Sequence, residues 1–588
     1  MEYLVKDRTS IYKIILPQNA TNEIEFAANE INYALKECCG CELPIICEES
    51  ELAEKGIYLG GTKKTLEKFD VLSLDKYSGD GFVVDIINGD VYIRSAGREG
   101  IIYGVYQFLN KVLGCEFFGY GAYELPKQED VVLEDQCFSA VPDIETRVRG
   151  LEWKHYDTTT ERRLGFNTGN GRIWVTWAHT YFQLVPKDKY YETHRDYYSP
   201  DGLQLCLTHP DIVDVVAKNA IARLTDEVFD KSDMLFLMVG QEDGYSFCDC
   251  DRCKQAEKKY GKSGIMMRFT NAVADIVNDY VEKNHPNKVV KTITFAYALT
   301  MDAPVKEENG ILKPLDDSVI AHKNVGIMYA PLESNWAYSL LDEKNNPQMS
   351  KALKGWKTIN GELFVWTYDG IFDDCFYFLD NWNWWAEHYR TFKDCGACYI
   401  FDQGYPLVNL PFTQLRNYVR GKLMWDLSLD AEILIKRFIK AYYKEASKTV
   451  GDFFYSLRRY YEKKQAEFEA EGKQYASCSG ANIMPFIREA DFWDKNFLEK
   501  SIEKMEECRK HLTDNDDFHG ALNRLEVEML TPIYVLMEMH GQTLSPEQID
   551  YYIHFFERVS SRNGIYAYSE WGGQIIEKLC NWATYLEV

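Results

Sequence analysis

The stretch 234–253, MLFLMVGQEDGYSFCDCDRC, decides how the rest of the chain is interpreted. Its first six residues form an apolar run with the length of a strand that is buried on both faces, as in a parallel sheet covered by helices. Glu242 and Asp243 follow just after the end of this strand. In barrels of alternating strands and helices, catalytic side chains collect at that end. The stretch therefore predicts either a catalytic pair or two carboxylates that cap the following turn.

The length, composition and net charge of the chain restrict the class of protein to which it can belong. At 588 residues it is too long for one hydrophobic core, and 46% hydrophobic with 27% charged residues is typical of a globular protein. No apolar run approaches the roughly 20 residues that a membrane-spanning helix needs. The 66 basic and 91 acidic residues give a net charge of −25, which repels a phosphate backbone and argues against nucleic acid as a partner.

Two further features concern the compartment and the ligand. The start of the chain, MEYLVKDRTSIYKIILPQ, lacks the pattern of a signal peptide, and 16 cysteines spread along the chain fit reduced thiols, so we expect a cytoplasmic protein. Aromatic residues make up 14% of the sequence. Such side chains fill cores, and they also stack on the apolar C–H faces of sugar rings.

Residues 1–138 are predicted to form a small α/β domain. Its signals are a strand over 11–16, a helix over 23–38, and two strands, 81–87 and 90–95, joined by the two-residue turn Asn88-Gly89. The stretch 96–126, AGREGIIYGVYQFLNKVLGCEFFGYGAYELP, resembles the end of the N-terminal accessory domain of α-glucuronidases and β-hexosaminidases. This resemblance implies that a catalytic (β/α)8 barrel follows.

Between residues 142 and 428, apolar runs alternate with longer helical segments, which is the pattern of parallel βαβ units. We expect eight strands that close into a TIM-like (β/α)8 barrel, over residues 147–153, 164–166, 203–207, 234–239, 292–298, 325–330, 363–368 and 398–401. The polar and aromatic side chains after these strands would then surround one opening.

Three motifs in this middle part carry a second resemblance. They are WAHTYFQLVP (177–186), GQEDGYSFCDCDRC (240–253) and RNYVRGKLMWDLSLD (416–430). Together they resemble the bacterial family called domain of unknown function 4838. That family accompanies the α-glucuronidase-like accessory domain and is usually taken for glycoside hydrolases, so the resemblance implies a reaction class and no particular substrate.

Residues 429–588 are predicted to be helical almost throughout. Apolar positions recur at helical spacing, and the expected helices span 431–446, 451–470, 491–512, 518–540, 546–562 and 573–585. We interpret this segment as a helical C-terminal domain that packs on the barrel and has a structural role.

Glycoside hydrolysis normally needs one protonated carboxyl group and one carboxylate. Glu242 is the predicted general acid, because it follows the fourth expected strand, where the barrel glycosidases that the chain resembles often hold their acid. Asp243 beside it would raise its proton affinity if both are desolvated. Asp243 could instead orient a substrate hydroxyl or nitrogen. Asp369 and Asp402, after later strands, are the candidates for the opposing carboxylate. The order Glu-Asp is the reverse of the pair in β-hexosaminidases, which puts catalysis through a substrate acetamido group in doubt.

The candidate substrate-binding residues are mostly aromatic. His179 could bind a sugar hydroxyl or be a satisfied buried histidine, and Arg172 could pair with a uronate or form an ordinary salt bridge. The other candidates, whose alternative role is packing in the core, are Trp153, Asn167, Trp177, Tyr297, Tyr329, Trp336, Trp366, Tyr368 and Tyr405.

Cys248, Cys250 and Cys253 form a compact C-x-C-x-x-C motif. Thiolates at this spacing can hold a structural zinc ion, although a structural site needs a fourth ligand that no second cluster provides. A labile disulfide and unmetallated thiols are the alternatives. The predicted reaction requires no cofactor.

The sequence therefore predicts a glycoside hydrolase that acts on an oligosaccharide, with a uronic acid or an acetamido sugar as the determinant of specificity. A carbohydrate-binding protein without catalysis, on the same barrel, is the second hypothesis. A zinc-dependent hydrolase is the third, and the absence of a histidine-rich metal motif argues against it. The oligomeric state has no signal in the sequence.

Overall fold

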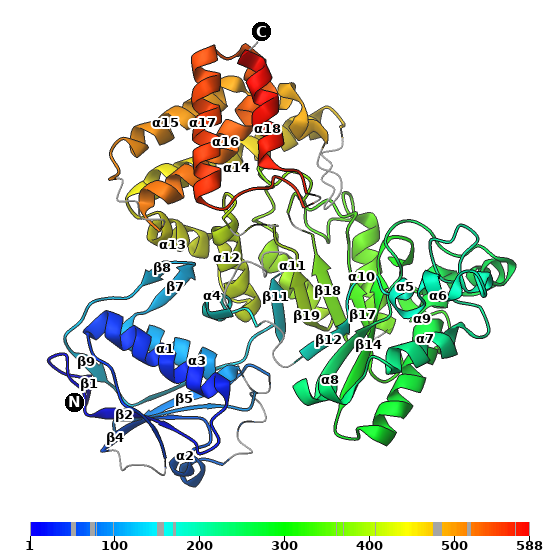
Figure 1. Ribbon diagram of the computed structural model, residues 1–588, viewed down its shortest axis with the longest axis horizontal. Helices are drawn as coiled ribbons and strands as arrows, with labels where there is room; N and C mark the ends of the chain where they lie inside the picture. The colour runs from blue at the N-terminus through cyan, green and yellow to red at the C-terminus, as the bar shows by residue number, and fades with distance from the viewer. Residues whose placement is uncertain are drawn as a thin grey trace.

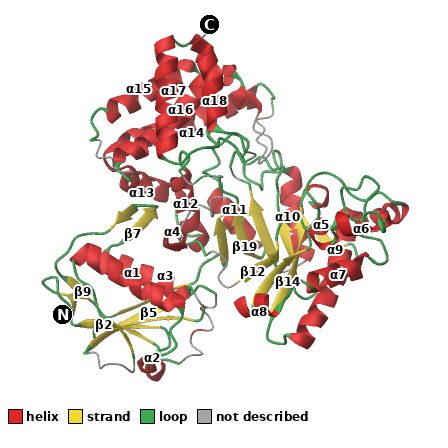
Figure 2. Ribbon diagram, viewed as in Figure 1, coloured by secondary structure: helices red, strands yellow, loops and turns green. Residues whose placement is uncertain are grey.

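The computed structural model describes residues 2–586, except for 49–53, 71–73, 75–76, 78, 98, 150–157, 168–171, 360–361, 369, 406, 408, 474–484, 514–518 and 571. Strands gather into two main sheets, and the C-terminal part is helical (Figure 2). Helices α1 (Asn22–Cys39) and α3 (Gly100–Leu113) lie side by side on one face of the N-terminal sheet (Figure 1).

The N-terminal sheet has the strand order β10-β5-β6-β4-β2-β3. Its strands are β2 (Tyr12–Leu16), β3 (Ile45–Cys47), β4 (Lys55–Leu59), β5 (Phe82–Ile87), β6 (Asp90–Ser95) and β10 (Gln136–Ala140). The predicted hairpin of β5 and β6 is confirmed, with Asn88 and Gly89 at φ 52° and 80°. Positive φ at both positions is the geometry that an Asn-Gly turn favours.

Small elements surround this sheet. Helix α2 (Lys63–Lys68) begins at the cap Thr62, whose side chain accepts from the backbone N–H of Thr65. The remaining elements are two short strand pairs, β1 (Glu2–Val5) with β9 (Val131–Leu133) and β7 (Glu116–Gly119) with β8 (Ala122–Glu124).

The described residues of the middle part form a seven-stranded parallel sheet with the order β11-β19-β18-β17-β14-β13-β12. Its strands are β11 (Thr146–Arg149), β12 (Arg172–Thr176), β13 (Met234–Met238), β14 (Val289–Ala296), β17 (Val325–Tyr329), β18 (Leu363–Thr367) and β19 (Ala397–Asp402). Six of the eight predicted strands are therefore confirmed.

The sheet curls strongly. Trp174 of β12 and Tyr399 of β19 are separated by four strands in the sheet order, yet the indole N–H of Trp174 donates to the Tyr399 hydroxyl at 3.2 Å. Phe236 and Phe364 pack between them, at 5.0 Å and 5.2 Å from Trp174 and Tyr399 respectively. Large side chains thus fill the concave side of the sheet, as they fill the interior of a small barrel.

Two expected strands are wrong, and one strand was not expected. Residues 164–166 contain the end of α4 (Thr158–Leu164) and the turn after it, and residues 203–207 form a loop with a single bridge between Tyr198 and Leu205. Short apolar runs do not distinguish a strand from the buried side of a helix or loop. Strand β12, RIWVT, was missed; its continuous apolar run is only the three residues Ile173–Val175. Among the described residues, the expected closed ring of eight strands is accordingly a curled sheet of seven.

Helices cover the convex side of this sheet, and α9 (Asp251–Asn284) packs on β14 and β17 (Figure 1). Gly261, at φ 66°, divides α9 into two helical segments. The other connecting helices are α5 (Tyr181–Leu184), α6 (Lys187–Tyr190), α7 (Ile212–Ile221), α8 (Asp226–Lys231), α10 (Pro347–Ile359) and α11 (Trp385–Asp394). An exposed hairpin, β15 (Val305–Glu308) with β16 (Ile311–Pro314), precedes β17.

The C-terminal helices and the curled sheet share one contiguous cluster of buried hydrophobic residues. The helices are α12 (Thr413–Trp425), α13 (Ala431–Tyr443), α14 (Ser447–Ala470), α15 (Lys495–Arg509), α16 (Ala521–His540), α17 (Pro546–Arg562) and α18 (Ile575–Ala583). Helix α17 has the bounds expected from sequence, because Ser545 and Gln548 form a capping box and Pro546 occupies the first turn.

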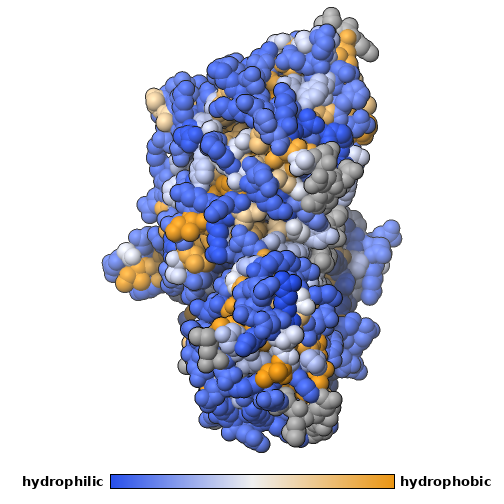
Figure 3. Space-filling view, turned by 90° about the vertical axis from the view of Figure 1, so that its left-hand side faces the viewer, coloured by the Kyte–Doolittle hydropathy of each residue, from blue (hydrophilic) through white to orange (hydrophobic). Residues whose placement is uncertain are grey.

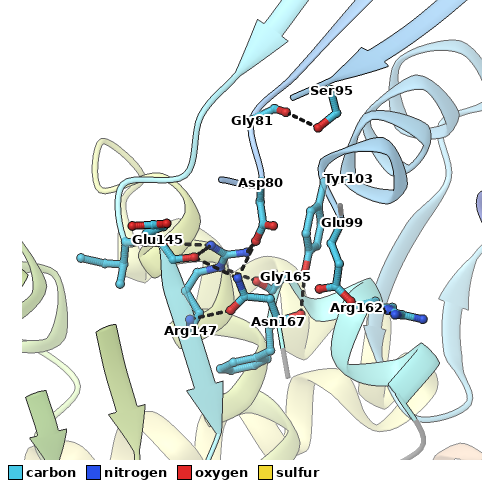
Figure 4. Close-up of polar contacts among 12 residues, drawn as sticks. Asp80, Gly81, Ser95, Glu99, Tyr103, Glu145, Arg147, Arg162, Gly165 and Asn167 are labelled. Carbon is cyan, nitrogen blue, oxygen red and sulfur yellow. Dashed lines mark hydrogen bonds and ion pairs between the residues drawn. The ribbon is translucent and has the colours of Figure 1, made fainter. Parts of the chain in front are cut away.

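A buried polar network joins the N-terminal sheet to the curled sheet (Figure 4). Arg147 of β11 donates to the Asp80 carboxylate at 2.8 Å, and both side chains are inaccessible to solvent. Asn167 lies in the same network: its amide nitrogen donates to Asp80 (2.5 Å) and its oxygen accepts from the Arg147 backbone N–H (2.6 Å). The hydrogen-bonding groups of Asn167 are thus used between the two sheets, away from the cleft described below.

The surface seen in Figure 3 is mainly hydrophilic, with hydrophobic residues in small separate groups. Within the described ranges, no helix combines the length and the apolar character needed to span a membrane. No disulfide joins any two cysteines in the part of the chain that the structure describes.

Candidate functional site

The loops after β12 and β13 are held together where they leave the sheet. A Cβ on Gly240 would lie 2.8 Å from the carbonyl oxygen of Ala178, so glycine allows the two backbones to approach. The Gly240 carbonyl accepts from the N–H of Thr180 at 3.0 Å. His179 and Asp243 are therefore neighbours, although they are 64 residues apart.

Glu242 points toward α5. Its Oε1 accepts from the backbone N–H of Phe182 at 2.7 Å. Gln204 holds its backbone, since the Gln204 amide donates to the Glu242 carbonyl (2.8 Å) and accepts from its N–H (3.0 Å). Burial raises the pKa of Glu242, against the opposing effect of the hydrogen bond from Phe182. This carboxyl group favours the protonated form more than an exposed one does.

Asp243 has a different environment. Its side chain is 71% exposed and lines an open cleft. The Tyr297 hydroxyl donates to its Oδ1 at 2.8 Å. His179 donates from Nδ1 to the Gln241 carbonyl (2.6 Å), which leaves Nε2 at 3.8 Å from the Asp243 carboxylate. Asp243, Tyr297 and His179 thus form one polar cluster at the carboxyl end of the sheet.

An aromatic surface adjoins this cluster. Trp177 and Trp366 are stacked with ring centroids 5.3 Å apart, and the Tyr368 ring is nearly parallel to that of Trp366, at 6.0 Å between centroids. Trp177 and Trp366 are half-buried, so part of their surface remains exposed to solvent. The structure brings these three predicted aromatic residues together with Tyr297 and His179.

A second carboxyl group comes from the C-terminal part of the chain. The loop between α17 and α18 lies beside the loop that follows β18 (Figure 1), and the Glu570 N–H donates to the Phe372 carbonyl at 2.8 Å. The indole N–H of Trp366 donates to Gln403 (2.6 Å), whose amide donates in turn to the Glu570 carboxylate (2.9 Å). Burial raises the pKa of Glu570, opposed by the Gln403 hydrogen bond.

Tyr368 connects the two carboxyl groups electrostatically. Burial raises the pKa of its hydroxyl, and Tyr297, Asp243 and Glu570 add to the effect. Both carboxyl groups therefore lie within interaction range of one tyrosine. Glu570 was missed because the helical pattern of the C-terminal segment was interpreted as structural. Its signal is the stretch 568–573, YSEWGG, which interrupts the helical pattern with an acid between aromatic residues.

The cleft at this position has a volume of about 700 Å³ and separates the end of the sheet from the C-terminal helices. Its acidic groups are accompanied by two cations, Arg488 and Lys578, which contact Asp373 (3.1 Å) and Glu538 respectively. The lining residues are Asp243, Asp373, Asp374, Tyr377, Arg488, Glu538, Met539, Tyr568, Ser569 and Lys578.

Several predicted site residues lie in the core instead. The Asp402 side chain is 1% exposed, accepts from Thr367 (2.7 Å) and forms an ion pair with Arg420. Tyr329, whose hydroxyl donates to the Met349 carbonyl at 3.1 Å, is fully buried. Trp336 and Tyr405 are 1% and 3% exposed. Their positions near strand ends gave no information on whether the side chain faces the opening or the core.

Other predicted residues fall outside what is described. Asp369 and Trp153 lie outside the described residues, and Arg172 is described only as the first residue of β12. Their proposed roles stay predictions.

The cysteine motif has a fourth member. Cys206 lies in the loop before α7, and its Sγ is 3.6 Å from that of Cys250 and 3.8 Å from that of Cys253. The sulfur atoms of these three residues and of Cys248 all lie within 4.8 Å of one another. Cys206 was missed because it is 42 residues before Cys248 and belongs to no local motif.

The sequence matches two family models. Residues 117–455 match the model described as domain of unknown function (DUF4838), which is more than half of the chain. Residues 3–108 match the N-terminus of glycosyl hydrolase family 67. No curated protein matches the chain in sequence.

The fold is similar to that of a family GH115 4-O-methyl-α-glucuronidase with specificity for decorated arabinogalactans. The superposition has a TM-score of 0.59 at 11% identity, and covers 97% of this chain and 78% of the relative. The structure of CpGH84D superposes with a TM-score of 0.47 at 8% identity, over 99% of this chain and 90% of its own length. The first likeness shows a shared fold, and the second is too low to add to the argument.

Proposed function

The chain belongs to the family described as domain of unknown function DUF4838, and from this membership and the geometry of the cleft we propose that it is a glycoside hydrolase. Two further findings support the proposal. The N-terminal residues match a segment of glycosyl hydrolase family 67, and the fold is shared with a GH115 glycosidase.

The pair Asp243 and Glu570, next to stacked aromatic rings, is the observation that carries the proposal. Glycosidases use two carboxyl groups whose environments separate their protonation states. Burial raises the pKa of Glu570, so Glu570 is the proposed proton donor to the leaving oxygen. The Asp243 carboxylate lies in the open cleft, where the Tyr297 hydroxyl stabilises its charge, and is the proposed base or nucleophile. Glu242, whose pKa burial also raises, is the alternative acid.

The aromatic surface supplies the sugar-binding part of the proposal. The exposed portions of Trp177 and Trp366 offer flat apolar surface for a pyranose ring. Nε2 of His179, close to Asp243, is free of the Gln241 hydrogen bond made by Nδ1 and is placed to bind a sugar hydroxyl. A ring stacked there would lie beside the polar cluster of Asp243, Tyr297 and His179.

A substrate with a uronic acid is the finer proposal. Arg488 and Lys578 line the cleft, and a guanidinium and an ammonium group are the usual protein partners of a carboxylate. The GH115 relative is described as acting on a methylated glucuronide, which is consistent with this choice. An acetamido sugar is the alternative. It would require Asp243 to orient the acetamido group, although Asp243 already accepts from Tyr297.

The test is a panel of aryl glycosides and natural oligosaccharides that includes α-glucuronides and N-acetylhexosaminides. We expect release of glucuronic acid from an α-glucuronide, and a loss of about 100-fold or more in kcat for D243N and E570Q, because general acid–base groups contribute about 10²–10⁴-fold. The matched controls D279N and E557Q, at exposed positions on α9 and α17, should retain full activity.

The outcomes of this panel distinguish the proposed catalytic residues from the alternatives. Full activity in folded D243N and E570Q would overturn the catalytic assignment, and a comparable loss in E242Q alone would transfer the acid role to Glu242. Saturable sugar binding without product, unaffected by D243N, would favour the alternative of a carbohydrate-binding protein.

A further inference from the structure

The four-cysteine cluster lies outside the cleft and has no part in the proposed reaction. Cys206, Cys248 and Cys253 are 1%, 2% and 0% exposed, and Cys250 is half-buried. A buried free cysteine usually behaves as a single small apolar side chain in the core. Here four of them, from two loops and the first turn of α9, converge on one point.

The spacing of the sulfur atoms fits a tetrahedral metal site. A zinc ion bound to four thiolates at about 2.3 Å places neighbouring sulfur atoms about 3.8 Å apart. The Cys206 sulfur lies 3.6 Å from that of Cys250 and 3.8 Å from that of Cys253. A disulfide needs about 2.05 Å between its sulfur atoms. The cluster therefore has the geometry of a metal site and not that of two disulfides.

The surroundings suit a negatively charged thiolate cluster. The Thr208 hydroxyl is 3.1 Å from the Cys253 sulfur, and the Arg252 guanidinium donates to the Cys206 sulfur at 4.0 Å. Cys253 belongs to the first turn of α9, where the helix dipole favours negative charge. Donors of this kind orient thiolate ligands and offset their charge.

We propose that Cys206, Cys248, Cys250 and Cys253 bind one structural zinc ion, which holds the loop that carries Glu242 and Asp243. Four thiolates fill a tetrahedral shell and leave no position for water or substrate, so the ion has no direct part in catalysis. The hypothesis of a zinc-dependent hydrolase at this motif is not supported by such a closed site.

The link to the cleft runs through Gln204. It lies two residues before Cys206, and its side-chain amide makes both hydrogen bonds to the backbone of Glu242. A second tie joins the same loops, because the Ser246 hydroxyl donates to Asp201 at 2.5 Å. Zinc would thus fix the loop before α7 against the loop after β13. This effect on the cleft rests on the proposed function, whereas the binding of zinc does not.

The test measures the metal first. We expect one zinc ion per chain by inductively coupled plasma mass spectrometry of the full-length protein purified under reducing conditions, and less than a tenth of that in C206S. C580S, which removes an exposed cysteine on α18, should retain one zinc ion. Wild-type protein with no zinc after incubation with ZnSO₄ and reductant, or C206S with full zinc, would overturn the proposal.

A second measurement covers the case in which C206S does not fold. Wild-type protein stripped by a chelator and loaded with Co²⁺ should show the absorption of a tetrahedral cobalt–tetrathiolate complex, and zinc should abolish it. Removing zinc should also speed hydrogen exchange in residues 197–206 and 240–253 without changing exchange in α17. Unchanged exchange would refute the clamping role. Neither readout needs a substrate, so failure of this proposal is distinguishable from failure of the proposed glycosidase activity.

Discussion

Replacing Glu528 by glutamine should change how the stability of the protein depends on pH. Glu528 lies on α16 and is 3% exposed. Its Oε1 accepts from the Tyr443 hydroxyl (2.7 Å), and its Oε2 accepts from the Phe412 N–H (3.0 Å). Arg524, one turn earlier, donates instead to the carbonyls of Tyr442 and Gly121. Burial raises the pKa of Glu528 from its ordinary 4.5 to about 8, although both hydrogen bonds oppose this.

The sign and size of the effect follow from linkage. Between pH 4.5 and 8 the folded protein keeps a proton on Glu528 that the unfolded chain has lost, so folding takes up a proton and stability falls as the pH rises. The slope is about 1.4 kcal/mol per pH unit in the middle of this range and about half of that at either end, so the loss between pH 5 and 8 is roughly 3.5 kcal/mol. E528Q removes this titration. Relative to wild type, the free energy of unfolding of E528Q should therefore increase by about 3.5 kcal/mol between pH 5 and 8.

Urea unfolding followed by circular dichroism at pH 5, 6.5 and 8 measures this difference. Asp374 and Asp380, whose pKa values burial raises to about 7, also make stability fall with pH, but they do so in both proteins and cancel in the comparison. E557Q, at an exposed position of α17, should run parallel to wild type. Parallel curves for E528Q and wild type, or divergence in the opposite direction, would refute the reasoning.

Two further outcomes follow from the polar networks. D80N leaves the buried Arg147 guanidinium without its carboxylate partner and should lower the free energy of unfolding by about 3–5 kcal/mol. Urea unfolding measures this change, with D279N as the control. A loss under about 1 kcal/mol would contradict the expectation. Y297F removes the hydrogen bond to Asp243 and should lower kcat/KM about 10- to 100-fold on the best glycoside of the panel, because a hydrogen bond to a charged group contributes about 1.5–3 kcal/mol. Y566F, at an exposed tyrosine, is the control, and equal kinetics in both variants would remove Tyr297 from the site.

The elements that could be predicted from sequence have strong local signals. Strand β13 is a continuous apolar run, the β5–β6 hairpin has an Asn-Gly turn, and α17 begins with a serine cap followed by proline. The misplaced strands at 164–166 and 203–207 are short apolar runs, and such runs do not distinguish a strand from the buried side of a helix or loop. The closed ring of eight strands was inferred from a count that included them.

The candidate site could be predicted only in part, because its members meet through the tertiary fold. His179, Tyr297 and Asp243 follow parallel strands that are adjacent in the sheet, so their proximity follows from strand order. Tyr329, Trp336 and Tyr405 also lie near strand ends, but their side chains are in the core. The direction of a side chain at a strand end depends on the last backbone angles of the strand, which residue type does not determine.

Glu570 and Cys206 show why a residue of the candidate site and a residue of the neighbouring cysteine cluster can both be missed when only local sequence motifs are searched. Glu570 is 327 residues after Asp243, and the two are related by the packing of the loop between α17 and α18 on the loop after β18. Cys206 completes the cysteine cluster from a loop whose own sequence has no metal motif. In both cases a loop that is distant in sequence supplies one member of a cluster whose other members follow the strands of the sheet. In the proposed function, the C-terminal part contributes chemistry as well as packing, because the loop between α17 and α18 supplies Glu570, the carboxyl group that is linked to Trp366 through Gln403.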